Sequence, residues 1–368
     1  MKFKIIKNEL SNMLSHAMNF TNQRDLNTIY QNIYIESLDN KILLKTFNGQ
    51  SAFLTTVNAV VEEQGVTTVP CKKLLEIVKE FPENSVLDFT LRDGRVNIKC
   101  GKSSFNLSIL PPEMFPTISE IKGEYYLKVS SKKISNIIKK TYFCISNDHS
   151  KIEYTGCHLK VYGNIIEASA ADYQRIAYAF TELDEEFSDE FIVNIPKKTV
   201  SELLKLLDKD DTLDISTDKT QIMFKIGDIQ VYSNLVNKYI RNMKSLFSAE
   251  YNTKLTIKRN LLLDAIKRVA TITDEENHGI IISFGEDRAS VYSLETDYGA
   301  GQEYIEDMKL EGEPVDMVFN SKHLIEVIGA FDTDIITIRI NSRRSPVIFE
   351  SEEDWYKYVV VPLTIERF

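Results

Sequence analysis

Three short segments carry residue types that could do phosphate or metal chemistry. Gly101-Lys102-Ser103-Ser104 has the residues that end a phosphate-binding loop, but the preceding glycine is missing and a strand pattern follows. Glu275-Glu276-Asn277-His278 contains metal-ligand types, yet its surroundings predict a solvated loop. Asp208-Lys209-Asp210-Asp211 follows a predicted helix and is typical of a charged turn. We therefore predict no metal and no cofactor.

Nucleophilic side chains are also present, but they do not form a catalytic pattern. The five histidines are scattered, and no order of serine, histidine and aspartate, or of cysteine and histidine, matches a known catalytic arrangement. Cys71, Cys100, Cys144 and Cys157 contain no CxxC pair, so we expect reduced, buried thiols in a cytosolic protein. The sequence predicts a protein that is not an enzyme.

Composition limits the class of protein and raises one conflict. The chain is 43% hydrophobic and 27% charged, which is ordinary for a globular protein. No apolar run reaches the ~18 residues of a membrane span, and residues 1–9 show no secretory signal, so we expect a cytoplasmic protein that binds no membrane. The formal net charge of −10 argues, by itself, against a nucleic-acid partner.

The elements that would position any site occur in three copies. A short alternating strand followed by apolar residues four apart recurs with intervals of 124 and 128 residues, at Leu10, Ile134 and Leu262. A second helix pattern recurs with intervals of 126 and 124 residues, at Leu74, Val200 and Leu324. Two independent markers with one period predict three tandem globular domains. We place them at 1–122, 123–250 and 251–368, with linkers near 111–116 and 237–251.

Each copy is predicted to run strand, helix, strands, helix, strands. The helical patterns cover residues 7–18, 72–81, 131–142, 197–207, 258–268 and 321–328. In the first two copies, β-rich stretches cover 29–37, 42–46, 53–61, 86–91, 96–100, 104–110, 158–161, 165–170, 176–182, 212–216, 221–225 and 229–235. Asp93-Gly94 marks a hairpin. The order predicts an α+β class, with two helices per domain packed on antiparallel sheet.

Positive charge is concentrated on the predicted helices. The net charge of their core segments is +11; these segments are 7–18, 72–79, 131–140, 197–205, 258–268 and 321–328. Because the whole chain has a net charge of −10, the residues outside these segments carry −21. On a single helix, lysines indicate only a solvated face. Six helices at repeat-equivalent positions in an acidic chain favour a basic surface suited to the phosphate backbone. No base-reading motif is present, so any such contact would be independent of DNA sequence.

Several stretches resemble one known family along the whole chain, the bacterial sliding clamps (the β subunit of DNA polymerase III). The resemblance rests on residues 65–73, 105–116, 171–177, 195–198 and 358–363. It implies three similar domains in a head-to-tail homodimeric ring, with twelve helices around the hole and continuous sheet outside. The ring would encircle duplex DNA as a processivity factor and tether the replicative polymerase, the clamp loader and repair proteins. The alternative is a protein-interaction scaffold that does not encircle DNA.

The resemblance also implies three sets of site residues. A pocket for short apolar peptides would use Tyr154, Ala171, Tyr173, Gln174, Arg175, Ile176, Leu246, Ser345, Pro346, Val359, Val360, Val361, Pro362 and Leu363. Together with the charge pattern, it indicates DNA contacts from Arg24, Lys72, Lys73, Lys132, Lys133, Lys139, Lys140, Lys197, Lys198, Lys258, Arg259, Lys267 and Lys322. A subunit junction would join Phe105 and Leu107 to Thr271 and Ile272.

The chain departs from the family pattern at four places. Tyr173 stands where the family usually has glycine, and Ile240-Arg241-Asn242-Met243 replaces its Phe-Pro-Asp-Tyr segment. Thr271 replaces a more apolar residue, and Thr364–Phe368 extends the usual ending. We therefore expect a peptide preference that differs from the family's consensus.

Overall fold

The computed structural model describes residues 1–118, 121, 125–207, 211–240, 247, 251–275 and 278–364. The chain divides into two compact units, residues 1–132 with 201–235 and residues 133–200 with 236–368. The predicted domain boundary at 122 and 123 lies outside the described residues, as does residue 250. The division into three domains therefore stays a prediction.

All six predicted helices are present. They are α1 (Lys7–Met18), α2 (Cys71–Glu80), α3 (Ser131–Lys139), α4 (Lys197–Leu204), α5 (Arg259–Ala270) and α6 (Ser321–Gly329). Two end three residues earlier than predicted, and Tyr142–Cys144 forms a 3-10 turn after α3. The repeat markers Leu10, Leu74, Ile134 and Val200 are all at most 1% exposed. The 3.6-residue period therefore identified the faces that the helices bury.

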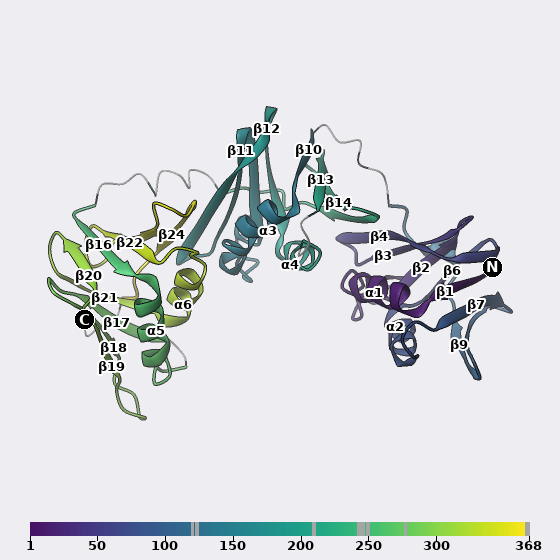
Figure 1. Ribbon diagram of the computed structural model, residues 1–368, viewed down its shortest axis with the longest axis horizontal. Coiled ribbons are helices and arrows are strands. Elements are labelled where there is room, and N and C mark those ends of the chain that lie inside the picture. The colour runs from purple at the N-terminus through teal and green to yellow at the C-terminus, as the bar shows by residue number, and fades with distance from the viewer. Residues whose placement is uncertain are drawn as a thin grey trace. The chain divides into compact units, whose positions relative to one another are not determined.

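The first unit contains two antiparallel sheets. One has the order β5 (Val60–Glu63), β1 (Lys2–Ile6), β7 (Val86–Arg92), β8 (Arg95–Cys100) and β9 (Ser103–Ser108). The other has the order β10 (Tyr125–Ser130), β13 (Thr212–Thr217), β14 (Gln221–Ile226), β15 (Ile229–Asn234), β4 (Ser51–Asn58), β3 (Lys41–Phe47), β2 (Asn32–Ser37) and β6 (Gly65–Pro70). In Figure 1, α1 and α2 lie together on one side of these strands.

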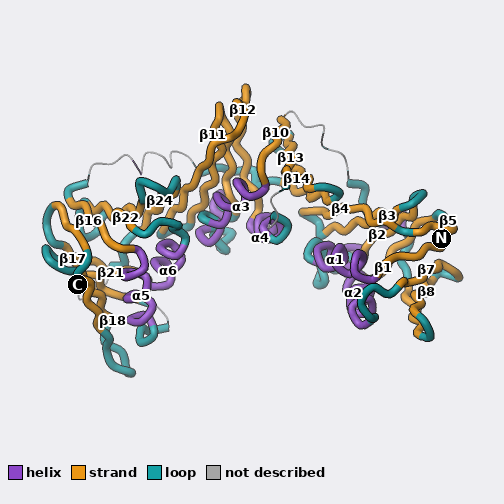
Figure 2. The backbone as a smooth tube through the Cα atoms, in the orientation of Figure 1, coloured by secondary structure: helices purple, strands orange, loops and turns teal. Residues whose placement is uncertain are grey.

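The second unit also contains two antiparallel sheets. The larger has the order β11 (Gly156–Ala171), β12 (Arg175–Pro196), β24 (Tyr356–Val360), β23 (Val347–Glu350), β22 (Ile335–Ile340), β16 (Thr253–Lys258) and β20 (Met308–Glu311). The smaller has the order β19 (Gln302–Ile305), β18 (Ala289–Ser293), β17 (Gly279–Phe284) and β21 (Val315–Asn320). Figure 2 shows α5 and α6 near each other beside these strands, and the two helices are in contact.

Strand pairing joins neighbouring repeats within each unit. In the first unit β15 pairs with β4, with Val231 opposite Phe53. In the second unit β12 pairs with β24, with Ala177 opposite Tyr358. Each pairing satisfies backbone groups at a strand edge that would otherwise be open to another chain. Sheet therefore continues from one repeat into the next.

Three strand predictions need correction. Residues 158–161 and 165–170 belong to one strand, β11, whose register shifts around Gly163, where φ is +52°. The predicted strand 29–37 begins with a 3-10 turn at Thr28–Gln31, and the predicted strand 53–61 divides into β4 and β5. The Asp93-Gly94 hairpin is confirmed, because both residues have positive φ and join β7 to β8 in a tight turn.

The thiols follow the prediction with one exception. All four cysteines are free; Cys71, Cys144 and Cys157 are buried, whereas Cys100 is half-exposed. Burial raises the pKa of Cys71 to about 12 and that of Cys157 to about 11, so these two thiols are protonated and unreactive at neutral pH. Among the described residues, no helix combines the length and apolar character that crossing a bilayer requires.

Candidate nucleic-acid, peptide and subunit interfaces

Basic side chains gather in the first turns of the repeat helices. α2 to α6 have no acidic residue in that turn. The cations there are Lys72, Lys73, Lys132, Lys133, Lys197, Lys198, Arg259 and Lys322. The helix macrodipole disfavours a cation at this end by about 0.3–1 kcal/mol. Helix stability therefore does not explain the placement, and exposed cations at these positions would attract an anionic ligand.

Several of the predicted DNA-facing cations are exposed and form no ion pair with another described residue. They are Arg24, Lys72, Lys132, Lys198, Lys267 and Lys322. Arg24 lies in the turn after α1, and Lys267 lies in the last turn of α5. Lys139 is also exposed, at the end of α3. Arg24, Lys72, Lys132, Lys198, Lys267 and Lys322 can therefore approach a polyanion without first breaking an ion pair with a described residue.

Three further candidates form ion pairs at the surface. Lys73 lies 2.8 Å from Glu76, and Lys133 and Lys258 each lie 2.5 Å from an aspartate carboxylate, that of Asp184 or Asp307. Exposed pairs of this kind contribute about 0–1 kcal/mol and are screened by salt. A phosphate group could therefore replace the carboxylate at little cost.

Two candidates have a different environment. The Lys140 side chain is 13% exposed and lies between Asp354 and Asp332, with 2.9 Å to the latter. Lys197 Nζ donates to the Ile145 carbonyl at 2.6 Å and to Asn147 Oδ1 at 2.9 Å, and burial lowers its pKa. These contacts favour a structural role over a DNA contact for both lysines. Arg259 is half-buried, and its Nε has no partner among the described residues.

Arg175 organises the predicted peptide site. Its side chain is 9% exposed, and three neighbours accept its N–H groups: the Asp172 carboxylate at 2.9 Å, the Glu326 carboxylate at 2.5 Å and the Phe143 carbonyl at 2.9 Å. Its guanidinium also stacks over the Phe143 ring, 5.8 Å from the ring centroid. The side chain therefore ties β12 to α6 and to the turn after α3, and presents little free donor surface to a peptide.

Tyr173 forms part of an aromatic cluster with the preceding loop. Its hydroxyl lies 2.5 Å from Ser150 Oγ, and its ring meets Tyr154 edge-on with centroids 5.7 Å apart. Lys151 Nζ lies over both rings, 4.8 Å from the Tyr173 centroid and 5.7 Å from that of Tyr154. The Tyr173 side chain is still 49% exposed. The ring that replaces the family's glycine is therefore anchored by several contacts.

The C-terminal strand supplies the other wall of the predicted peptide site. In β12, Arg175 pairs with Val360 and Ile176 with Val359 of β24, and both valines are at most 3% exposed. Val361 follows with 41% exposure, and its N–H donates to the Gln174 carbonyl at 2.8 Å. The two valines thus belong to the core, and Val361 is the apolar member available to a ligand.

The remaining predicted pocket residues are placed as follows. Ala171 pairs with Ile176 at the β11–β12 turn and is buried. Ser345 and Pro346 precede β23, whose Val347 pairs with Val360, and the Leu363 N–H donates to the Val318 carbonyl at 2.8 Å. Pro362 is buried. Leu246, Arg241–Met243 and Ile365–Phe368 lie outside the described residues. The structure brings together the described members of the set around the β12–β24 ladder.

The predicted subunit junction uses exposed edge positions. β9 is an edge strand of its sheet with nearly all residues exposed; Phe105 is 42% exposed and packs edge-on against Phe81, centroids 5.7 Å apart. Leu107 is half-buried on the same strand. In the third repeat, Thr271 is the C-cap residue after α5, and Ile272 packs beside Gly301, where an added Cβ would lie 3.2 Å from Ile272 Cγ2. Both patches keep apolar surface accessible.

Opposite charges surround these two patches. Beside β9, the exposed basic side chains are Arg92, Arg95, Lys99 and Lys102. Beside Ile272, a cavity of about 580 Å³ has four acidic residues in its lining, namely Asp274, Glu275, Glu295 and Asp297. Glu276 and Asn277 of the metal-like segment lie outside the described residues, and the described residues contain no group of three or more metal-ligand side chains placed to hold an ion. The acidic cavity therefore suits a basic protein surface better than a metal.

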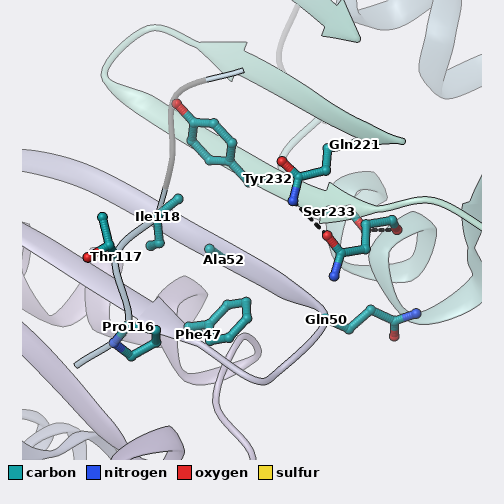
Figure 3. A pocket seen from close by; sticks show the side chains of 10 residues that line it. Phe47, Gln50, Ala52, Pro116, Thr117, Ile118, Gln221, Tyr232 and Ser233 are labelled. Carbon is teal, nitrogen blue, oxygen red and sulfur yellow. Dashed lines mark hydrogen bonds between the residues drawn. The ribbon is translucent and has the colours of Figure 1, made fainter. Parts of the chain in front are cut away.

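A smaller cavity of about 170 Å³ lies at the β4–β15 joint, and no sequence pattern predicted it. Figure 3 shows Phe47, Pro116 and Tyr232 around it, together with the hydrogen bond of 2.8 Å from Gln221 to Asn234. Its lining carries no charged side chain. The cavity belongs to the connection between the first two repeats and contains none of the predicted site residues.

Sequence reasoning missed the residues that hold the predicted sites in place. Glu326 and the Phe143 carbonyl fix Arg175 from distant parts of the chain, and Asp354 fixes Lys140. The Asp172–Arg175 pair, three residues apart, was the only one of these contacts with a local signal. No spacing rule predicts the others, because they join residues more than 30 positions apart.

Comparisons with known proteins agree with this architecture. Three family models match, described as the N-terminal, central and C-terminal domains of the DNA polymerase III beta subunit, over residues 1–119, 128–239 and 244–364. The beta sliding clamp of Staphylococcus epidermidis is 26% identical over 364 residues, covering 96% of each chain. That of Synechococcus elongatus is 27% identical over 356 residues, covering 95% of each.

Solved structures share the fold over nearly the whole chain. The DNA polymerase sliding clamp from Bacillus subtilis has a TM-score of 0.95 at 22% identity, covering 99% of each chain. A sliding clamp from Pseudomonas aeruginosa bound to griselimycin has a TM-score of 0.93 at 23% identity, covering 99% of this chain and all of the other. At this identity, the likeness shows the clamp fold.

The fold and its cationic helices define the class as a DNA clamp. The chain belongs to the DNA polymerase III beta subunit family. It is therefore a sliding clamp: a processivity factor that is not an enzyme, acts as a homodimer, and binds both DNA and polymerase partners.

Proposed function

We propose that the exposed cations of the repeat helices are the groups through which this clamp meets duplex DNA. The observation that supports this assignment is that most of these cations, among them Lys72, Lys132, Lys198 and Lys322, lie in helix first turns, where the macrodipole opposes them, in a chain of net charge −10. We place Arg24, Lys72, Lys132, Lys198, Lys267 and Lys322 at the centre of this set. Lys73, Lys133, Lys139, Lys258 and Arg259 complete it.

The contacts are weak and shared, which suits sliding. An exposed lysine near a phosphate adds a small, salt-dependent increment that is independent of base sequence. Deep, well-fixed phosphate sites would hold the protein at one position on the duplex. Retention on DNA would come instead from closure of the homodimeric ring around it. We place the clamp in the cytoplasm, where it would encircle duplex DNA.

We propose that peptides of the polymerase, the clamp loader and repair proteins dock beside the β12–β24 ladder. Val361, Tyr173 and Gln174 are exposed there and can contact the peptide. Arg175 positions this surface through its contacts with Asp172 and Glu326. Docking raises the effective concentration of a polymerase at the primer end, because both then sit on one DNA molecule.

We propose that the subunit contact joins β9 of one copy to the α5 end and β19 edge of the next. Phe105 and Leu107 would meet Thr271 and Ile272, and the basic residues beside β9 would face the acidic cavity lined by Glu295 and its neighbours. Complementary charge speeds and orients association. The pairing would also cover exposed strand edges. In this assembly each domain, 1–122, 123–250 and 251–368, acts as one clamp unit.

Loading on circular DNA tests the DNA assignment. The homodimer is loaded by a clamp loader onto nicked circular DNA, and a parallel sample is linearised after loading; gel filtration then measures the retained protein. We expect retention on the circle and loss from the linear ends. Equal loss from both would support the alternative, a peptide-binding scaffold that does not encircle DNA.

A charge variant separates the DNA contact from ring closure. A clamp with Lys72, Lys132 and Lys198 replaced by alanine should keep its solution mass of about twice 42.3 kDa and its peptide binding. It should load less efficiently or leave DNA faster. A variant that loads and is retained as well as the unaltered protein would contradict the assignment of these cations.

A further inference from the structure

A cavity of about 360 Å³ in the second unit has an aromatic wall and a charged rim. Its lining includes Lys133 and Asn136 of α3, Lys140 just after that helix, Phe180 of β12, and Glu353 and Trp355 of the loop before β24. It shares no residue with the predicted peptide site. Trp355 is the only tryptophan in the chain and is 41% exposed, which is unusual for so large an apolar side chain.

The aromatic wall is rigid. The Trp355 and Phe180 rings stack with centroids 4.8 Å apart and planes 20° apart. The Phe180 N–H also donates to the Trp355 carbonyl at 3.1 Å. One face of the Trp355 indole therefore packs on Phe180, and the ring is held in place with part of its surface accessible to solvent.

The charges on the rim form a fixed network with an excess of negative charge. Lys140 binds Asp332 and Asp354, and the Asp332 N–H donates to the second oxygen of Asp354 at 3.1 Å. Lys133 is paired with Asp184. Glu353 is exposed and forms no ion pair with another described residue. Both lysines of the lining are thus paired, while the Glu353 carboxylate, two positions before Trp355, has no ion-pair partner among the described residues.

We propose that this cavity is a second docking site, which takes an arginine side chain from a peptide segment of a partner protein. A guanidinium group stacks on an indole face through its planar, delocalised charge. It can at the same time donate to the Glu353 carboxylate and to Asp332, whose side chain is 82% exposed. The cavity volume accommodates one such side chain. The site would give the clamp a contact with basic partner segments in addition to the apolar peptide site.

The lining favours this occupant over a nucleic-acid base. A base could stack on Trp355, but its phosphates would meet three carboxylates, those of Asp332, Glu353 and Asp354. Lys140 offsets one of these charges through its pairs with Asp332 and Asp354, and Lys133 is paired with Asp184 outside the lining, so an excess of negative charge remains. The negative excess therefore selects a cation and disfavours a polyanion.

Fluorescence of the single tryptophan tests the proposal directly. The full-length protein is titrated with N-acetyl-Gly-Arg-Gly-amide, with the same peptide carrying citrulline in place of arginine, and with a short oligothymidylate. Citrulline keeps the shape of arginine and removes its charge. We expect a saturable change in Trp355 emission with the arginine peptide, at least about tenfold weaker affinity for the citrulline peptide, and no saturable change with the oligonucleotide.

Two neighbouring variants provide the matched control. Glu353→Gln should weaken the affinity for the arginine peptide by about fivefold or more. Glu352→Gln, at an exposed position outside the lining, should leave this affinity unchanged. Both changes are at exposed loop positions, and circular dichroism verifies that both proteins are folded. Equal affinity for arginine and citrulline, an equal effect of the two substitutions, saturable binding of the oligonucleotide, or no response to any probe would each overturn the proposal.

Discussion

The hydroxyl oxygen of Tyr173 lies 2.5 Å from Ser150 Oγ, which links the β11–β12 turn to the loop before Tyr154. This contact, the Tyr154 ring and the Lys151 ammonium hold the Tyr173 ring at the predicted peptide site. The resemblance to the family implies glycine at this position in other members. Tyr173 is therefore a fixed part of the surface that a docking peptide meets.

Removing this ring should bring the peptide preference closer to that of the family. We expect Tyr173→Gly to bind the family's consensus peptide about three to ten times more tightly, the scale of roughly 1 kcal/mol. Tyr173→Phe keeps the ring and loses only the contacts of the hydroxyl group with Ser150 and Asp148, so it should change the affinity less. A fluorescence titration with labelled peptide measures both. Unaltered affinity in Tyr173→Gly would refute a role for the ring.

Salt dependence should separate a DNA-facing lysine on α3 from a structural lysine that directly follows this helix. Lys132 is exposed, whereas Lys140 lies between Asp332 and Asp354. Lys132→Ala should reduce the slope of log K against log salt concentration by up to about 0.9, the value for one lost phosphate contact. Lys140→Met should leave the slope unchanged. Anisotropy with labelled duplex DNA over a salt series measures it, and a reversed order would contradict our assignment.

The same two positions should show the opposite order in stability. Lys140→Ala leaves the Asp354 carboxylate, 8% exposed, without its cation, and we expect a loss of about 3 kcal/mol in the free energy of unfolding. Lys132→Ala, at a solvated position, should change it by no more than about 0.5 kcal/mol. Urea unfolding followed by circular dichroism gives both values. Equal effects would show that the buried ion pairs contribute little.

His158 should make the fold sensitive to acid. Burial lowers its pKa to about 4; its Nε2–H donates to the Glu153 carbonyl at 3.0 Å, and Nδ1 has no partner among the described residues. The unfolded chain binds a proton below about pH 6.5, whereas the folded chain resists protonation down to about 4. Stability is thus complete above pH 6.5 and is lost progressively as the pH falls toward 4, by about 3 kcal/mol.

A histidine variant measures this contribution. His158→Gln removes the titrating group, so its free energy of unfolding should fall less between pH 7 and pH 4.5 than that of the unaltered protein. Burial also lowers the pKa values of His16 and His323, which act in the same direction and leave a smaller residual slope. Urea unfolding at several pH values gives the slopes. Parallel slopes in the two proteins would mean that His158 does not control this pH range.

Phe105 should anchor the homodimer. We expect Phe105→Ala to raise the dissociation constant of the dimer by about 10- to 100-fold, as truncation of a central aromatic residue usually does. Val60 offers a matched control, because it is 66% exposed on β5, the opposite edge strand of the same sheet. Sedimentation equilibrium measures both constants. A larger effect of Val60→Ala than of Phe105→Ala would indicate that the subunits meet through β5, and would contradict our assignment of β9.

Local pattern was enough to predict the repeats and the helices. Leu10, Ile134 and Leu262 mark the helices because an amphipathic helix repeats its buried positions within a few residues, and all three are at most 1% exposed. The sequence also predicted the Asp93-Gly94 turn, because the backbone geometry of this turn depends on two adjacent residues. The excess of cations on the helices was likewise visible in the sequence alone.

Only the tertiary structure decided which of the predicted site residues are available to bind a ligand. It buried Lys140 between two aspartates more than 190 positions away, and it enclosed Arg175 with Glu326 and Phe143. It also merged two predicted strands into β11 and joined β12 to β24. Such pairings depend on chain segments that meet only after folding, so no local period carries them. The sequence alone indicated the kind of surface, and the fold determined which residues form it.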